Sequence, residues 1–172
     1  MSARTMGARA FIPVVLAATI VITTAPATPV AASTATTEAA QIVRIARAQL
    51  GDPWRYGASG PRSFDCSGLI LYAYRRAGDY RILRSGSLRS ARALYRWFKA
   101  HHLTSRTNPR IGDLVVWGGG SHIGLYIGNG KAISTLRNGV KIHSIGAVTA
   151  KFTAYIHTGM AAARTTTPAP TS

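Results

Sequence analysis

The chain has 172 residues, of which 21 are lysine or arginine and five are aspartate or glutamate, so its formal net charge is +16. An excess of this size concerns partners rather than fold, and it indicates binding to anionic polymers or surfaces. The single cysteine excludes an internal disulfide. No segment carries an RNA- or DNA-binding motif, so we expect no nucleic-acid partner.

The N-terminus has the layout of an export signal. Arg4 and Arg9 precede the apolar run AFIPVVLAATIVI, and Val30 and Ala32 occupy the small-x-small positions of a cleavage site. We therefore predict a secretion signal peptide over residues 1–32. Its removal from the 172 residues leaves 140, and the net charge falls from +16 to +14 because the signal holds two basic residues and no acidic one.

The predicted location is outside the cell, in association with the cell wall. A bilayer-spanning helix needs about 20 apolar residues, and Pro13 and Thr19 interrupt the apolar run. An uncleaved N-terminal anchor is therefore the less favoured alternative. The remaining length suits one compact domain, which we expect to be a monomer.

The first half of the predicted domain is helical. After a flexible start at residues 33–37, EAAQIVRIARAQLG has the apolar spacing of an amphipathic helix. The loop DPWRYGASGPRS follows. DCSGLILYAYRRAG predicts a second helix, with Asp65 as its N-cap and Gly78 at its end. SLRSARALYRWFKAHH predicts a third, basic helix.

The second half changes to short β-type runs separated by glycine-rich turns: DLVVWG, HIGLYIGN, KAISTL, VKIHSI and FTAYIHTGM. Helices followed by a meander of antiparallel strands indicate the α+β class. The composition of residues 161–172 is typical of a disordered tail.

Cys66 lies at the predicted start of the second helix, where free backbone N–H groups and the helix dipole favour an anion. We expect these groups to stabilise the thiolate, the attacking form of the side chain. A nucleophilic cysteine also needs a base. His122 is the best candidate among the five histidines, because it opens the strand HIGLYIG directly after the turn GGGS.

The base in turn needs a partner that orients it. Asn138-Gly139 is a strong signal for a two-residue hairpin. If Arg137 pairs with Val140, Ser134 lies opposite His143 on the same face of the sheet. Either of these two side chains can then orient His122.

The segments QLGDPWRYG, FDCSGLILYAYRRAG and IGDLVVWGGGSHIGLYIGNGKAI, in this order, resemble the NlpC-type cell-wall endopeptidases over roughly residues 40–157. The resemblance implies a papain-like α+β domain over residues 38–160, with helices packed on a meandering antiparallel sheet. It implies Cys66 as nucleophile and His122 as base. Asp65 and Ser67, on either side of the cysteine, would shape the oxyanion site.

The sequence departs from the family pattern at two positions. Ser134 aligns with the third polar residue, where family members usually have His, Glu, Asn or Gln, and His143 can compensate for the short serine across the hairpin. Trp54 stands where many members have a tyrosine, so the substrate contact of that hydroxyl is altered or moves to Tyr56.

The resemblance implies cleavage of peptide stems in peptidoglycan, typically between D-glutamate and a diamino acid, without a cofactor. No residues have metal-ligand spacing, and the basic surface suits anionic wall polymers. Two alternatives remain open. One is an amidase or transferase that uses the same Cys66 and His122, and the other is a catalytically weak or inactive module that binds the cell wall.

Overall fold

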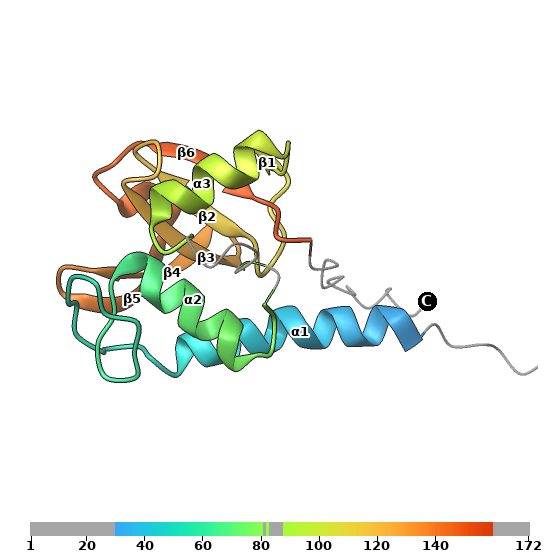
Figure 1. Cartoon of the computed structure of the whole chain (residues 1–172), viewed down its shortest axis with the longest axis horizontal. Coiled ribbons are helices and arrows are strands. Elements are labelled where there is room, and N and C mark those ends of the chain that lie inside the picture. The colour runs from blue at the N-terminus through green and yellow to red at the C-terminus, as the bar shows by residue number, and fades with distance from the viewer. Residues whose placement is uncertain (1–29, 81, 83–87, 160–172) are drawn as a thin grey trace, which may run out of the picture.

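The computed structural model describes residues 30–80, 82 and 88–159, with side chains from residue 38 onward. The described helices and strands follow the predicted order, helices first and strands second (Figure 1). Their bounds are α1 Val30–Arg47, α2 Cys66–Arg76, α3 Ala91–Ala100, β1 Thr104–Ser105, β2 Leu114–Trp117, β3 His122–Gly128, β4 Lys131–Leu136, β5 Gly139–Ser144, the 3₁₀ turn η2 Ile145–Ala147 and β6 Phe152–Ile156. The predicted α+β class is confirmed.

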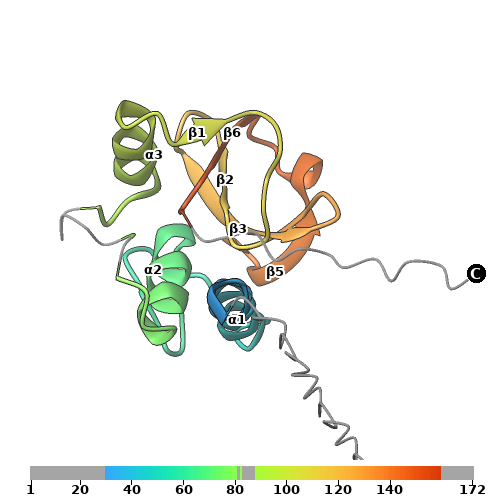
Figure 2. The ribbon, with the colours of Figure 1, turned by 90° about the vertical axis from the view of Figure 1, so that its right-hand side faces the viewer.

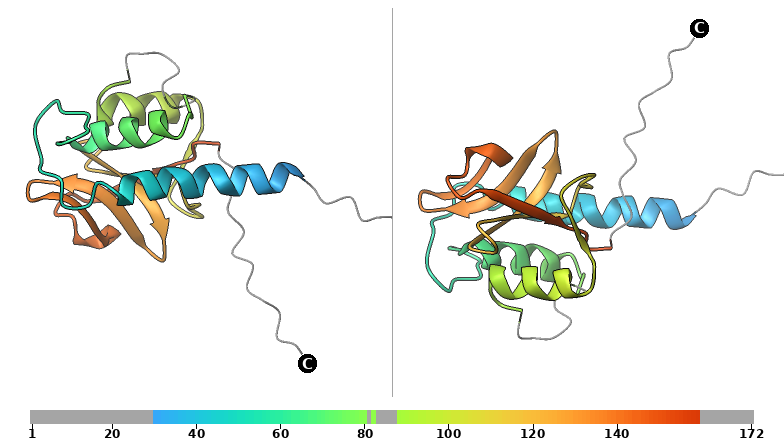
Figure 3. Two further views of the ribbon diagram at one scale, coloured as in Figure 1. Left: turned by 90° about the horizontal axis from the view of Figure 1, so that it is seen from below. Right: turned by 90° about the horizontal axis from the view of Figure 1, so that it is seen from above.

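The six described strands form one antiparallel sheet in the order β1-β6-β2-β3-β4-β5. Strands β2 to β5 are the predicted meander, and β6 returns to pair with β2. The two-residue strand β1 at the edge was not predicted. Helix α2 contacts β3 and β4, while α3 contacts β3 and β6, so the helices and the sheet form separate layers (Figures 2 and 3).

Helix α1 begins earlier than the sequence suggested. It starts at Val30 and includes residues 33–37, so the prediction of a flexible start was wrong. Alanine is the best helix former, and no glycine or proline interrupts this segment. The predicted signal peptide before Val30 and the predicted tail at 161–172 lie outside the described residues. Within the described part, no helix combines the length and apolarity needed to cross a bilayer.

Helix α2 has the predicted ends. The Asp65 carboxylate accepts a hydrogen bond from the Gly68 amide, and Gly78 takes a positive φ of 80° just after the helix. A Cβ atom at Gly68 would lie 2.0 Å from the Ala58 carbonyl oxygen. Glycine at this position therefore lets the loop before α2 pack directly on its first turn.

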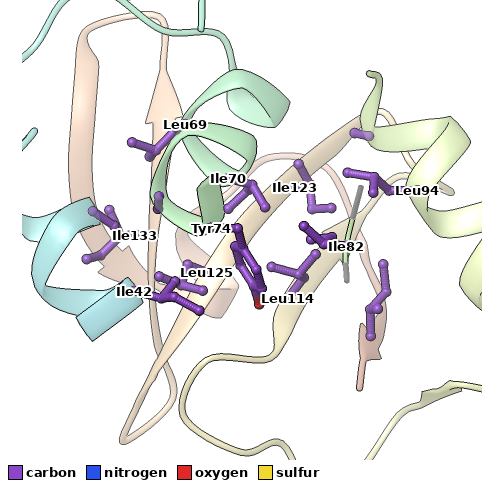
Figure 4. Packing of buried hydrophobic residues seen from close by; sticks show 14 of the residues in the cluster. Ile42, Leu69, Ile70, Tyr74, Ile82, Leu94, Leu114, Ile123, Leu125 and Ile133 are labelled. Carbon is purple, nitrogen blue, oxygen red and sulfur yellow. The ribbon is translucent and has the colours of Figure 1, made fainter. Parts of the chain in front are cut away.

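The main core lies between the helices and one face of the sheet (Figure 4). Tyr74 of α2 is fully buried, and its hydroxyl donates a hydrogen bond of 2.6 Å to the Gly112 carbonyl. This bond ties α2 to the start of the sheet. The surrounding side chains include Ile42, Leu69, Ile70, Leu114, Ile123, Leu125 and Ile133.

The β4–β5 hairpin has a different register from the predicted one. Leu136 pairs with Gly139, so the turn residues are Arg137 and Asn138 rather than Asn138 and Gly139. Gly139 takes a φ of 98°, and a Cβ there would lie 2.7 Å from the Asp52 carbonyl oxygen. Close approach to this loop therefore fixes glycine at the start of β5 instead of within the turn.

Candidate active site

Cys66 and His122 lie on the wall of one open pocket of about 640 Å³. Cys66 is the first residue of α2 and His122 the first residue of β3. Both ends are set by local structure, since Asp65 caps the helix and the Gly118–Ser121 turn precedes the strand. Strand and helix thus present their first side chains to the same space.

Backbone contacts hold the two segments together. The backbone amide of Ile123, the residue that directly follows His122, acts on the Cys66 thiol and lowers its pKa, as do the amides of Ser67 and Cys66 itself. At Gly120, in the turn before His122, a Cβ would lie 2.8 Å from the Cα of Arg92. The turn therefore packs against the first turn of α3, which closes another side of the pocket.

Behind His122, three side chains form a hydrogen-bonded row. His122 Nε2 lies 2.9 Å from Ser134 Oγ, and Ser134 Oγ lies 2.7 Å from His143 Nε2. His143 Nδ1 lies 2.9 Å from the Ser144 carbonyl oxygen. We call this row, from His122 to the Ser144 carbonyl, the histidine array.

The array fixes which nitrogen of His122 carries the proton. The Ser144 carbonyl can only accept, so Nδ1 of His143 donates to it, and Nε2 of the neutral ring accepts from the Ser134 hydroxyl. Ser134 Oγ then accepts from Nε2–H of His122. The lone pair of His122 is left on Nδ1, which has no hydrogen-bond partner among the described residues.

The predicted contact between Ser134 and His143 exists despite the changed register. Ser134 pairs with Lys141, and His143 pairs with Ala132. A shift of two residues keeps the same face of the sheet, so Ser134 and His143 are diagonal neighbours. Ser134 contacts His122 directly, and His143 contacts Ser134 on the side away from His122.

Trp117 and Gly124 shape the space around the array. The buried Trp117 ring lies 5.3 Å from the His122 ring and 5.8 Å from the His143 ring, and its Nε1 donates to the Ile145 carbonyl at 2.9 Å. A Cβ at Gly124 would lie 3.0 Å from Ser134 Cβ and 3.2 Å from Trp117. Trp117 is therefore a core residue that packs against the array.

Burial is the largest cause of the pKa shifts of Cys66 and His122. Burial, together with the charge of Asp65, raises the pKa of the Cys66 thiol above its ordinary value, although the amides of Ile123 and Ser67 act in the opposite direction. The expected shift toward thiolate was therefore wrong in direction. Burial, followed by repulsion from the His143 ring when that ring is protonated, lowers the pKa of His122 to about 4. At neutral pH the pair rests as a thiol and a neutral imidazole.

Asp65 and Ser67 belong to a clamp centred on Arg89. The guanidinium forks onto the Asp65 carboxylate at 2.8 and 3.1 Å, donates to Ser67 Oγ at 2.8 Å and reaches the Ala58 carbonyl at 3.3 Å. Burial alone would raise the pKa of Asp65, but the hydrogen bonds from Arg89 and Gly68 hold it below its usual value. Asp65 is thus the predicted helix cap. Both it and Ser67 also line the pocket.

Trp54 and Tyr56 lie on the pocket rim. Trp54 is 38% exposed and Tyr56 is 87% exposed. The Arg137 guanidinium lies 5.7 Å from the centre of the Trp54 ring. Both aromatic residues singled out from the sequence therefore belong to the pocket that Cys66 and His122 line.

Arg89 was not recognised in the sequence, where it read as part of a basic helix. Its partner Asp65 lies 24 residues earlier, and no local pattern indicates such a pairing. Within the described residues, no group of three or more histidine, cysteine, aspartate or glutamate side chains has the arrangement of a metal site.

A cysteine at a helix start beside a histidine on an antiparallel sheet defines a papain-like α+β domain. The chain belongs to the NlpC/P60 family, whose model matches residues 51–158. It is 40% identical over 100 residues to the murein DD-endopeptidase MepH of Escherichia coli. The aligned region covers 55% of this chain and 35% of that relative. The chain thus spans about a third of that relative's length.

Two solved structures show the same fold. The P60 domain of an antigen from M. avium paratuberculosis superimposes with a TM-score of 0.57 at 22% identity, over 75% of this chain and 98% of that one. RipD of Mycobacterium tuberculosis, described as a non-catalytic NlpC/p60 domain protein adapted to peptidoglycan binding, gives a TM-score of 0.52 at 24% identity, over 70% and 95%.

Proposed function

We propose that this protein is a secreted cysteine peptidase that hydrolyses amide bonds in the peptide stems of peptidoglycan. The observation that carries the proposal is the joint placement of Cys66 and His122 on one pocket, with the lone pair of His122 held on Nδ1 by the histidine array. Family membership and the likeness to MepH support the substrate class.

The reaction begins from the neutral pair. As Cys66 Sγ bonds to the carbonyl carbon, the thiol proton passes to His122 Nδ1. The backbone amides of Cys66 and Ser67, in the first turn of α2, face the developing oxyanion. The C–N bond then breaks, His122 gives its proton to the leaving amine, and a thioester remains on Cys66.

Water completes the cycle. His122 takes a proton from the water as its oxygen bonds to the thioester carbon, and the C–S bond breaks to restore the thiol and release the acid. When His122 is protonated, Ser134 accepts from its Nε2–H and stabilises the imidazolium. His143 keeps the Ser134 lone pair directed toward His122, so both residues act as positioning residues.

The pocket and the charge suit a wall substrate. Exposed Arg92 and Arg137 line the pocket together with Arg89, and they favour the carboxylates of stem peptides. The net charge of +14 expected after export would hold the enzyme on anionic wall polymers, an attraction that salt screens. We place the protein outside the cell on the evidence of its N-terminal signal sequence.

The scissile bond is the bond between D-glutamate and a diamino acid, as the family resemblance implies. The name of MepH points to a different bond, the cross-link that a DD-endopeptidase cleaves. Mass spectrometry of digested, purified peptidoglycan separates the two, because one cut shortens the stem and the other opens the cross-link.

The test compares the intact chain with Cys66→Ala and, as a matched control, Ser63→Ala, which removes a side-chain oxygen from the nearby loop. We expect stem fragments from the intact protein and the control, and none from Cys66→Ala. A freed lactyl group or a newly formed amide would instead assign an amidase or a transferase. Wall binding by the intact protein without any product would assign a binding module.

A further inference from the structure

A second row of polar side chains crosses the other end of the sheet. Ser105 lies on the edge strand β1, His157 directly follows β6, and Asp113 directly precedes β2. Ser105 Oγ lies 2.8 Å from His157 Nε2, and His157 Nδ1 lies 2.8 Å from Asp113 Oδ2. The serine and the aspartate lie 52 and 44 residues from the histidine in sequence, so only the fold brings the three together.

Asp113 is fixed independently of the histidine. Its side chain is 3% exposed, and it accepts hydrogen bonds from the amides of Arg110 at 2.8 Å and Thr158 at 3.4 Å. A carboxylate can only accept, so Nδ1 of His157 carries the proton. In the neutral ring Nε2 then holds its lone pair toward the hydroxyl of Ser105.

The hydroxyl of Ser105 has a second acceptor within reach, the Thr107 carbonyl oxygen at 2.6 Å. Rotation about the Cβ–Oγ bond moves the hydrogen from that carbonyl to Nε2 of His157. No backbone movement is needed. Ser105 is half-buried and the His157 side chain is 29% exposed, so both can meet a substrate.

An open pocket of about 430 Å³ adjoins the row. Its lining is polar and includes Ser105 and His157 themselves, with Thr107, Asn108 and Arg110. The side chains of Asn108 and Arg110 are exposed and have no hydrogen-bond partner among the described residues. Both are donors that can face an oxyanion formed at Ser105.

A nucleophile, a base, an orienting carboxylate and an adjoining pocket with free donors satisfy the geometric requirements of a serine hydrolase site, which is recognised by roles rather than by sequence position. We propose that Ser105, His157 and Asp113 form a second nucleophilic site that hydrolyses short-chain acyl esters independently of Cys66. A pocket of about 430 Å³ has room for a short acyl group and part of its carrier.

The reaction balances without an external reagent other than water. Ser105 Oγ bonds to the ester carbonyl carbon while its proton passes to His157 Nε2. The bond to the alkoxy oxygen breaks, and the alcohol leaves with that proton. Water then bonds to the acyl carbon, gives its proton to His157, and displaces Ser105, which regains its hydrogen as the carboxylic acid departs.

The test uses the full chain with Cys66→Ala, so that no thiol can react. The protein is incubated with a fluorophosphonate probe, which forms a stable bond to activated serines, and peptide mapping locates the label. Turnover of p-nitrophenyl acetate is followed in the same preparation. Companion proteins carry Ser105→Ala, His157→Gln or, as a control serine without a histidine partner, Ser63→Ala.

We expect the label on Ser105, at least a tenfold slower labelling rate in His157→Gln, and none in Ser105→Ala, while Ser63→Ala labels like its parent. Absence of label on Ser105 with the row intact would overturn the proposal, whatever the stability of the variants. Label on another residue, or a rate unaffected by His157→Gln in folded protein, would overturn it as well. None of these outcomes bears on the cysteine site.

Discussion

Two histidines of the same sheet, His122 and His157, each lie within hydrogen-bond distance of a serine through Nε2, at 2.9 and 2.8 Å. Their other nitrogens differ. Nδ1 of His157 faces the Asp113 carboxylate, whereas Nδ1 of His122 has no partner among the described residues. The ring therefore presents its lone pair toward the serine in one case and away from it in the other. On this ground we assign the proposed nucleophile to Ser105 and the proposed supporting role to Ser134.

Burial separates the two serines in the same way. Ser134 is fully buried and lies between two rings, while Ser105 is half-buried at a pocket. A substrate cannot reach Ser134, so its hydroxyl can only position His122. The nucleophile that we propose for that site comes from another element, Cys66 at the start of α2.

The largest expected effect comes from removing one base at a time. His122→Ala should lower peptidoglycan turnover by about 10²–10⁴-fold, the range that general acid–base catalysis contributes, and leave labelling of Ser105 unchanged. His157→Gln should slow the labelling of Ser105 and leave peptidoglycan turnover unchanged. Mass-spectrometric product yields and probe labelling measure the two activities in the same samples. Loss of both activities in either folded variant would show that the sites are not independent.

Ser134→Ala tests the support role. The substitution leaves Nε2–H of His122 without its acceptor and frees the ring to change tautomer. We therefore expect kcat to fall by about 10–100-fold, the range found when residues that orient metal-binding side chains are replaced. KM should stay near its original value, because Ser134 does not reach the pocket. His143→Ala should have a smaller effect in the same direction. A change confined to KM would contradict this role.

Arg89→Ala removes four hydrogen bonds around the start of α2 and leaves the partly buried Asp65 without its cation. We expect a loss of about 1–3 kcal/mol in the free energy of unfolding, measured by urea denaturation, and reduced turnover because Cys66 is adjacent. Arg89→Lys should recover only part of both, since an ammonium cannot form the fork. Full recovery by lysine would mean that charge alone matters.

The pH dependence of kcat/KM follows from the lowered pKa of His122. The base works when unprotonated, so activity should fall as the pH drops through about 4, rather than through the ordinary histidine range. His143→Ala removes the second cause of the lowering, while burial remains. Its acidic limb should therefore move to higher pH, toward the ordinary value without reaching it. An unchanged limb would exclude the influence of His143.

The last predicted effects concern only the stability of the hairpin that carries the array. Gly139→Ala should cost about 1–3 kcal/mol in thermal or urea unfolding, because φ is positive and the Cβ meets the Asp52 carbonyl. Asn138→Ala should stay within about 0.5 kcal/mol, the usual range for surface changes. A comparable cost at Asn138 would favour the Asn-Gly turn expected from the sequence.

The sequence predicted what local signals determine. Asp65 and Gly78 mark the ends of α2, and the period of apolar residues gives β2 to β6. The predicted hairpin register was wrong by two residues. Gly139 lies at the start of β5 because its backbone approaches the Asp52 carbonyl closely, and no local sequence pattern reveals that contact. The error preserved the face of the sheet, and for that reason Ser134 and His143 still meet.

Long-range packing explains the rest of what was missed. Arg89 reaches back 24 residues to Asp65, and Ser105, Asp113 and His157 come from three separate segments. The expected thiolate rested on the amides at the start of α2, which do lower the pKa of Cys66. It could not include the burial of the thiol in the folded domain, which outweighs them.

The tautomer of His122 is the most direct test of this account. The histidine array, the neutral pair and the role of Ser134 all require the proton to be on Nε2. Long-range ¹H–¹⁵N correlation spectra of the ¹⁵N-labelled protein at neutral pH report the tautomer of each histidine. We predict that His122 carries its proton on Nε2 with Nδ1 unprotonated. A ring protonated on Nδ1, or on both nitrogens, would contradict the account.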